Sequence, residues 1–184
     1  RFACADAARF RLRDALRAQA LADSLTRYAS AYIEAGSIHY VLYLQLKKRL
    51  PKEVHIKPIF IAHKALQTMG ERGHLYGPGD RLTLRYILHP NSKATPGDGL
   101  LAARSLVYAK LVEKEELSAD LETLPHIRNE FACIQAVKRL TLDDCQRLFP
   151  LIRRAKSVNV RHVVEDYLTR FKKQDPPAAY SLSN

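Results

Sequence analysis

The sequence predicts an all-α protein: an array of antiparallel helical hairpins, an α-solenoid-like stack of degenerate repeats that ends in a short extended C-terminal tail. Three observations support this prediction. Apolar residues recur at three- and four-residue steps along most of the chain. Strand-like stretches are confined to residues 53–61 and 158–164, and both are short. Capping residues, glycines and prolines divide the helical pattern into segments of roughly 12 to 16 residues.

The expected helices follow one another in chain order. They span residues 7–21, 24–35, 37–50, 58–72, 80–88, 100–114, 118–124, 126–139, 142–156 and 159–173. Ser24 is the expected N-cap of the second helix, Gly36 its stop, and Pro51 ends the third. Thr141, with Asp144 three residues later, is a further N-cap signal.

Each expected helix has an apolar face that predicts which side chains turn inward. In the first four helices these are Phe10, Ala15, Leu16, Leu21, Leu25, Tyr28, Tyr32, Ile33, Ile38, Val41, Leu42, Leu46, Phe60, Leu66 and Met69. Cys133 and Cys145 lie on apolar faces of later helices and are expected to be reduced core residues. Together with Cys4 they form no C-x-x-C pair, so neither a zinc ribbon nor a disulfide framework is expected.

A chain of 184 residues favours one domain. Residues 1–175 are expected to form a single helical-hairpin domain, and residues 176–184 a flexible or partner-bound tail. The loop at residues 89–99 holds two prolines and two glycines in eleven residues, so it offers a point of subdivision.

Candidate hairpins recur along the chain. Residues 24–48 and residues 128–154 each read as a helix, a compact turn and a second helix, and residues 60–75 read as the start of another such unit. Gly36 and Gly73 occupy equivalent turn positions. Such self-similarity at a spacing of about 35 residues is typical of helical-repeat proteins.

These hairpins resemble the pentatricopeptide family, and the best match is the stretch from Lys138 to Phe149. The tetratricopeptide family and unrelated helical hairpins remain alternatives. In RNA-binding pentatricopeptide proteins a small polar residue near the start of the first helix contacts a base. The corresponding position holds Arg27, Lys64 or Phe131, so the resemblance supports the hairpin fold better than it supports reading of an RNA sequence.

The chain is strongly basic, with 30 Lys and Arg against 19 Asp and Glu, a net charge of +11. The candidate basic docking surface comprises Lys47, Lys48, Arg49, Arg153, Arg154, Lys156, Arg170, Lys172 and Lys173. These clusters fit contact with RNA phosphates or with an acidic partner, and they equally fit solvated helix ends that complement helix dipoles. Tyr28, Tyr32, Tyr40 and Tyr43 could stack on bases, but their helical spacing favours packing between helices.

No catalytic, cofactor-binding or metal-binding residue is predicted, so the chain is not expected to be an enzyme. The seven histidines include no H-E-x-x-H pattern, and no G-x-S-x-G sequence occurs. The turn at Gly77, Pro78 and Gly79 lacks the Lys and Ser or Thr of a phosphate-binding loop. No apolar run approaches the roughly 18 residues of a membrane-spanning helix.

The start of the sequence is rich in Ala and Arg, which is typical of a mitochondrial targeting region and also of an amphipathic first helix. Because the first residue is Arg1 and not Met, the chain is expected to be a processed form. The chain is similar in form to small helical-repeat subunits of protist mitochondrial complexes. The functional prediction is therefore a non-enzymatic accessory subunit on the matrix side of a mitochondrial assembly, an ATP synthase or a respiratory complex, which docks neighbouring subunits. The alternative is a basic RNA-binding protein of the mitochondrial ribosome, which explains the charge more directly.

Overall fold

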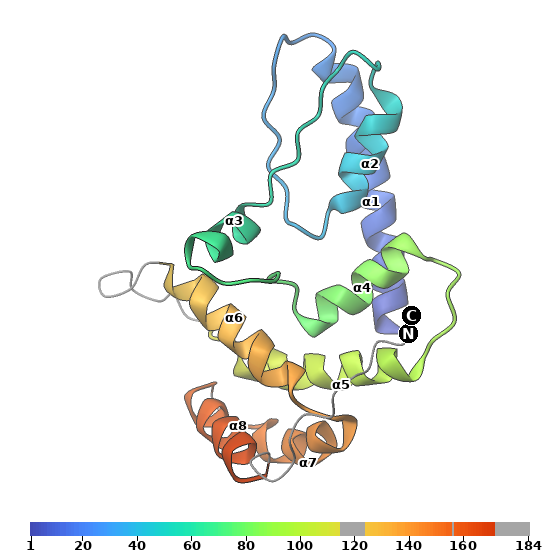
Figure 1. Cartoon of the computed structure of the whole chain (residues 1–184). Coiled ribbons are helices and arrows are strands. Elements are labelled where there is room, and N and C mark those ends of the chain that lie inside the picture. Colours follow the sequence, from blue (N-terminus) through green and yellow to red (C-terminus); the bar gives the residue numbers. More distant parts are fainter. Residues whose placement is uncertain (115–123, 156, 172–184) are drawn as a thin grey trace, which may run out of the picture. The chain divides into compact units, whose positions relative to one another are not determined.

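The structure, a computed structural model, describes residues 1–114, 124–155 and 157–171. Across these residues it contains eight α-helices and no β-strand, which confirms the all-α prediction (Figure 1). The chain forms two compact units, Arg1–Leu101 (unit 1) and Ala102–Asn184 (unit 2). They divide inside a helix, α5 (Pro96–Leu111), just beyond the loop at residues 89–99 where the sequence offered a subdivision.

Unit 1 contains α1 (Phe2–Leu25), α2 (Tyr40–Arg49), α3 (Ile61–Thr68), α4 (Pro78–Leu88) and the first residues of α5. Unit 2 contains the rest of α5, α6 (Pro125–Lys138), α7 (Leu142–Ile152) and α8 (Ser157–Phe171). Most of the short helix predicted at residues 118–124, and the whole predicted tail at residues 176–184, lie outside the described residues.

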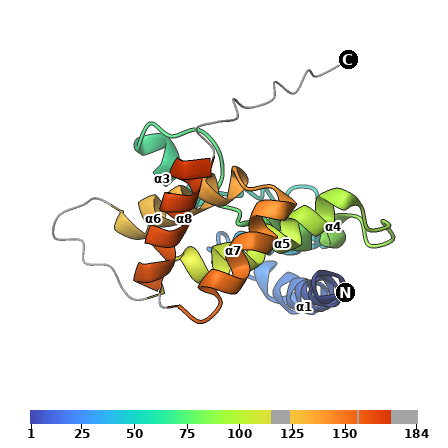
Figure 2. The same ribbon diagram turned by 90° about the horizontal axis from the view of Figure 1, so that it is seen from below.

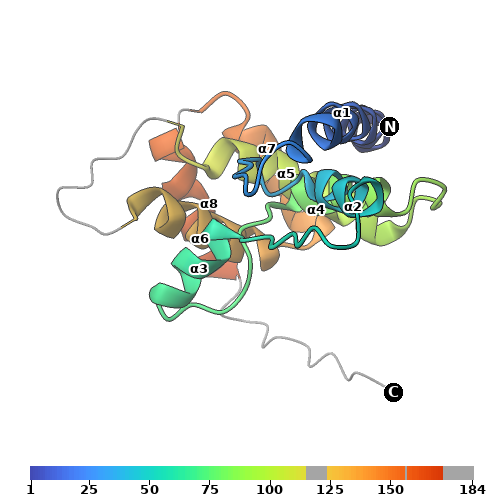
Figure 3. The ribbon, with the colours of Figure 1, turned by 90° about the horizontal axis from the view of Figure 1, so that it is seen from above.

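Helices α1 and α2 run parallel to each other. Ala7, early in α1, shares a hydrophobic cluster with Val41 at the start of α2. Leu25, at the end of α1, shares another cluster with Leu50, directly after α2. Figures 1 and 3 show the two helices side by side, with both C-terminal ends on the same side. Residues 26–39 carry the chain back to the start of α2.

The helix predicted at residues 24–35 is wrong, and with it the hairpin expected at residues 24–48. Ser24 does not cap a new helix: its hydroxyl donates to the Ala20 carbonyl at 3.2 Å and so lies within α1. Residues 26–39, all of them described, form neither helix nor strand. A short helix needs a buried apolar face, and Tyr28 and Tyr32, expected to supply one, are exposed.

The parallel pair is joined by a buried carboxylate. Asp14, in the middle of α1, is fully buried, and its Oδ1 lies 2.6 Å from Nδ1 of His39, the residue before α2. Its Oδ2 accepts a hydrogen bond from the backbone N–H of Leu42 at 3.1 Å. The first N–H groups of a helix lack partners within the helix, and a carboxylate there also complements the helix dipole. Asp14 therefore caps α2 from a neighbouring helix.

A second buried carboxylate joins α4 to α5 within unit 1. Arg85 donates to Asp98 Oδ1, while Asp98 Oδ2 accepts from the Tyr86 hydroxyl at 3.2 Å and from the Thr95 backbone N–H at 2.7 Å. The Arg85 hydrogen bond, followed by those from Thr95 and Tyr86, outweighs the effect of burial and holds the pKa of Asp98 below its usual value. These hydrogen bonds hold the loop between α4 and α5 against the first turn of α5.

This arrangement predicts an acid-sensitive contribution to stability. Because the pKa of Asp98 is lowered in the folded state, its contribution is present above the unfolded pKa of about 3.9 and is lost as the pH falls through the folded value. Urea unfolding of the wild-type chain from neutral pH to about pH 2 should show this loss. Asp98→Asn should be less stable at neutral pH and should approach the wild type in acid. Parallel pH curves for the two proteins would contradict the assignment.

Helix boundaries in the rest of unit 1 shift for local reasons. The helix predicted at residues 58–72 is the shorter α3, which ends just before Gly70. Gly70 has a φ of 75°, a conformation that favours glycine and stops a helix, so the expected stop at Gly73 comes too late. Asp80 lies inside α4 and accepts from the Gly77 backbone N–H at 3.1 Å, so the helix begins at Pro78.

Unit 2 has one continuous hydrophobic core, drawn from α5, α6, α7 and α8 (Figure 2). Its fully buried side chains include Val107, Val137, Leu140, Leu148, Ile152, Val160 and Val164. The predicted cap of α7 is confirmed: the Thr141 hydroxyl accepts from the Asp144 N–H at 3.2 Å, and Asp144 accepts from the Thr141 N–H at 2.7 Å. Cys133 and Cys145 are buried and unbridged, as predicted. Burial raises the pKa of the Cys133 thiol, which disfavours a reactive thiolate.

Candidate nucleic-acid interface

Six cations gather around the end of unit 1 at which α1 and α2 both finish. Arg27 follows α1; Lys47, Lys48 and Arg49 form the last turn of α2; Lys52 and Lys57 lie in the segment after it. We call these six residues the basic end. All six side chains belong to exposed residues.

A hydrophobic cluster holds the basic end together. Leu25, Leu46, Leu50 and Ile56 pack in this cluster, and each cation of the basic end lies within three residues of one of them along the chain. Arg27 lies at the same end as the Lys47–Arg49 triplet because α1 and α2 run parallel. An antiparallel pair would place Arg27 at the opposite end.

The cations of the basic end are not neutralised within unit 1. No carboxylate in the described part of the chain forms an ion pair with any of the six. The nearest acids along the chain are Asp23, Glu34 and Glu53, all exposed. Three of the cations complement the dipole of α2. Six positive charges within a small region nevertheless repel one another, and a polyanion would relieve that repulsion.

Three other exposed cations are each paired with an aspartate. Arg9 bridges to Asp6, Arg147 to Asp143 at 2.8 Å, and Arg170 to Asp166 at 3.6 Å. Each of these pairs lies on one turn of a single helix, where such spacing commonly produces ion pairs.

The predicted docking residues therefore divide into separate groups. Lys47, Lys48 and Arg49 lie together, and the fold adds Arg27, Lys52 and Lys57, which were not among the predicted docking residues. In unit 2, Arg153 and Arg154 lie directly after α7 and are exposed. Arg170 lies on α8, where it forms an ion pair with Asp166. Lys156, Lys172 and Lys173 lie outside the described residues.

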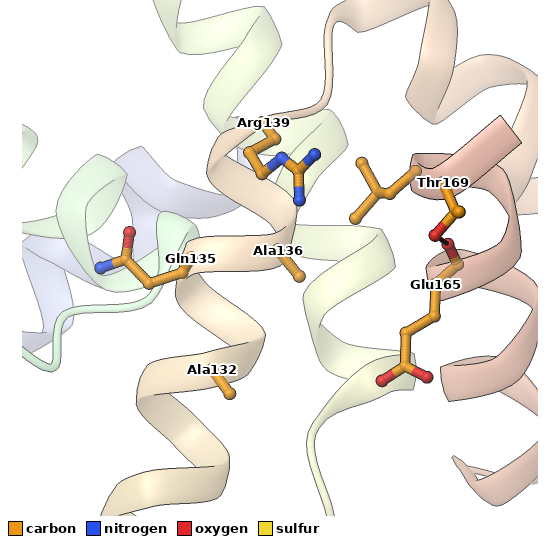
Figure 4. Close-up of a pocket in the computed structure, with 7 residues that line it drawn as sticks. Ala132, Gln135, Ala136, Arg139, Glu165 and Thr169 are labelled. Atoms are coloured by element: carbon orange, nitrogen blue, oxygen red, sulfur yellow. Dashed lines mark hydrogen bonds between the residues drawn. The ribbon is translucent and has the colours of Figure 1, made fainter. Parts of the chain in front are cut away.

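A groove between α6 and α8 of unit 2 has a volume of about 360 Å³ (Figure 4). Its lining consists of Ala132, Gln135, Ala136, Arg139, Glu165, Leu168 and Thr169. Five of these seven residues are themselves exposed, so the groove is shallow. Ligand sites usually enclose most of their ligand, and this groove does not have the form of one.

In the described part of the chain, no group of three or more His, Cys, Asp or Glu residues is placed to hold a metal ion. Among the same residues, none of the helices combines the length and the apolar character needed to cross a bilayer.

Comparison with known proteins identifies one similar chain, an uncharacterized protein of Archaeoglobus fulgidus. The two are 34% identical over 150 residues, which cover 81% of this chain and 49% of the relative. The chain thus spans about half the length of the relative it matches. No protein-family model matches the chain. No solved structure matches it either.

The archaeal relative corrects the predicted location. Archaea have no mitochondria, so the mitochondrial matrix predicted from the Ala- and Arg-rich start is wrong for a chain with such a relative. The Ala- and Arg-rich start forms the first half of α1, in which Ala7 is buried and the arginines are exposed or half-buried; a first helix was the second of the two interpretations that the sequence allowed.

Proposed function

We propose that this chain is a nucleic-acid-binding protein that acts without a catalytic step of its own, and that the basic end of unit 1 is its contact surface. The observation that carries the proposal is the set of six exposed cations with no ion-paired carboxylate among the described residues. Lysine and arginine side chains that bind phosphates release counterions from the nucleic acid, and this release drives association. The net charge of +11 favours the same class of partner.

The salt dependence of binding tests the proposal. Affinity for a fluorescently labelled, mixed-sequence RNA strand is measured over a salt series by anisotropy. For single strands, each neutralised phosphate contributes about 0.7 to the slope of log affinity against log salt. The triple variant Lys47→Gln, Lys48→Gln, Arg49→Gln should therefore reduce the slope by about 2 and weaken binding at physiological salt at least about tenfold.

A matched control removes the same charge from other places. Arg9→Gln, Arg147→Gln, Arg170→Gln also deletes three cations, but each of these is already paired with an aspartate. Its slope should stay within about 0.5 of the wild type, because these three cations lie outside the basic end and each has an aspartate one turn away that opposes contact with a phosphate. Equal losses in the two triple variants would mean that net charge alone drives binding, and the proposed surface would be wrong.

A helical scaffold that docks other protein subunits is a second candidate. It is favoured by Leu12 and Leu16, which lie one turn apart on α1 and are exposed, although Leu16 was predicted to face inward. Uncovered leucines of this kind are typical of protein contacts. The RNA measurement separates the two candidates: a chain that binds RNA only weakly, with the same slope in both triple variants, supports the scaffold.

A further inference from the structure

Two tyrosines of residues 26–39 are left uncovered. Tyr28 is 67% exposed and Tyr32 is 79% exposed. Neither ring stacks on another ring, and neither hydroxyl forms a hydrogen bond, with any residue that the structure describes. Both follow α1 in a stretch without helix or strand, and Tyr28 directly follows Arg27 of the basic end.

The other six described tyrosines all have partners. The Tyr40 and Tyr43 rings lie 5.6 Å apart. The hydroxyls of the remaining four donate to Ser37 O (Tyr76, 3.3 Å), Asp98 (Tyr86, 3.2 Å), Glu130 (Tyr108, 3.0 Å) and Asp144 (Tyr167, 2.8 Å). Tyr28 and Tyr32 therefore differ from the other described tyrosines, and packing within unit 1 does not explain their position.

We propose that Tyr28 and Tyr32 stack on unpaired bases, so that the basic end binds single-stranded nucleic acid in preference to duplex. This inference rests on the proposed function and names its substrate class. Aromatic side chains beside a cationic surface are the usual platform for single strands, since every base offers a flat face. In a duplex those faces are already stacked on one another and are closed to side chains.

The spacing of the two rings suits one strand. Four residues of extended chain span at most about 14 Å, so both rings lie within reach of bases only a few nucleotides apart. Arg27 provides a cation at the residue directly before Tyr28 in the chain. Glu34, two residues beyond Tyr32, is the acid nearest to the second ring along the chain and would be expected to limit the strand's path on that side.

The experiment compares Tyr28→Ala, Tyr32→Ala with Tyr28→Phe, Tyr32→Phe in the full chain. Binding is measured to a single strand and to its duplex, with RNA and DNA of the same sequence as separate arms. In the arm that binds more tightly, the alanine variant should bind the single strand at least about tenfold more weakly, and the phenylalanine variant should stay within about twofold of the wild type. The salt slope should be unchanged, because no cation is removed.

Duplex binding should be weaker than single-strand binding in the wild type and equal in all three proteins. Because both side chains are exposed, urea unfolding should be the same for the variants and the wild type. An alanine variant that binds the single strand as the wild type does, or a wild type that prefers the duplex, would overturn the stacking inference alone. Absence of binding to every nucleic acid, or binding that the Lys47, Lys48 and Arg49 substitutions leave unchanged, would instead reject the proposed function.

Discussion

Leu148→Asp is expected to unfold unit 2. Leu148 lies on α7 with none of its surface exposed, and it packs in the same core as Cys133, Leu140 and Val164. An aspartate there would place a carboxylate without a partner among apolar side chains, and would also remove a large apolar group. We expect a loss of about 4 kcal/mol or more in the free energy of unfolding. Urea titration followed by far-ultraviolet circular dichroism measures this loss.

Leu151→Asp is the matched control, because it introduces the same charge three residues later on the same helix. Leu151 is 67% exposed, so its substitution should change the free energy of unfolding by no more than about 0.5 kcal/mol. If Leu148→Asp and Leu151→Asp lowered the free energy of unfolding equally, the assignment of Leu148 to the buried face of α7 would be wrong.

The sequence predicted unit 2 well because its signals there are local. The capping box of Thr141 and Asp144 involves residues three apart, so the local sequence alone marks the start of α7. The apolar residues after it then repeat with the helical period, so Cys145 and Leu148 could be placed in the core from the pattern alone.

Unit 1 was predicted less well because its decisive contacts are distant in sequence. Tyr28 and Tyr32 have helical spacing, but no helix forms where no surface is available to cover one face. The contacts that pair α2 with α1 include those of Asp14 with His39 and Leu42, 25 and 28 residues away. Nothing in the local pattern around residues 26–39 carries that information.

The same contrast applies to the candidate site. The Lys47–Arg49 triplet is contiguous and was recognised from the sequence. Arg27 joins it because α1 and α2 run parallel and end together, and Lys52 and Lys57 join it because Ile56, in the segment after α2, packs in the same hydrophobic cluster (Figure 1). For the tyrosines, the helical spacing favoured packing between helices over base stacking, and base stacking gains support only once Tyr28 and Tyr32 are found exposed.

Asp14→Ala therefore tests the origin of the site as well as the stability of unit 1. The substitution removes the side-chain partner of His39 and one of the two acceptors of the Leu42 N–H, which also donates to the His39 carbonyl at 3.1 Å. We expect a loss of about 3 kcal/mol in the free energy of unfolding, because the buried Leu42 N–H and the half-buried His39 ring both lose the carboxylate that they contact. Asp23→Ala removes an exposed carboxylate from the same helix and should cost no more than about 0.5 kcal/mol.

The effect on binding should follow from the effect on structure. Asp14 is distant along the chain from every cation of the basic end, so a loss of RNA affinity in Asp14→Ala would come from loosened pairing of α1 with α2. We expect weaker binding and a smaller salt slope, because cations that no longer lie together contact fewer phosphates at once. If Asp14→Ala were destabilised but bound RNA with the wild-type affinity and slope, the cations would not need the parallel helices to act together. The basic end would then bind RNA without depending on the pairing of α1 with α2.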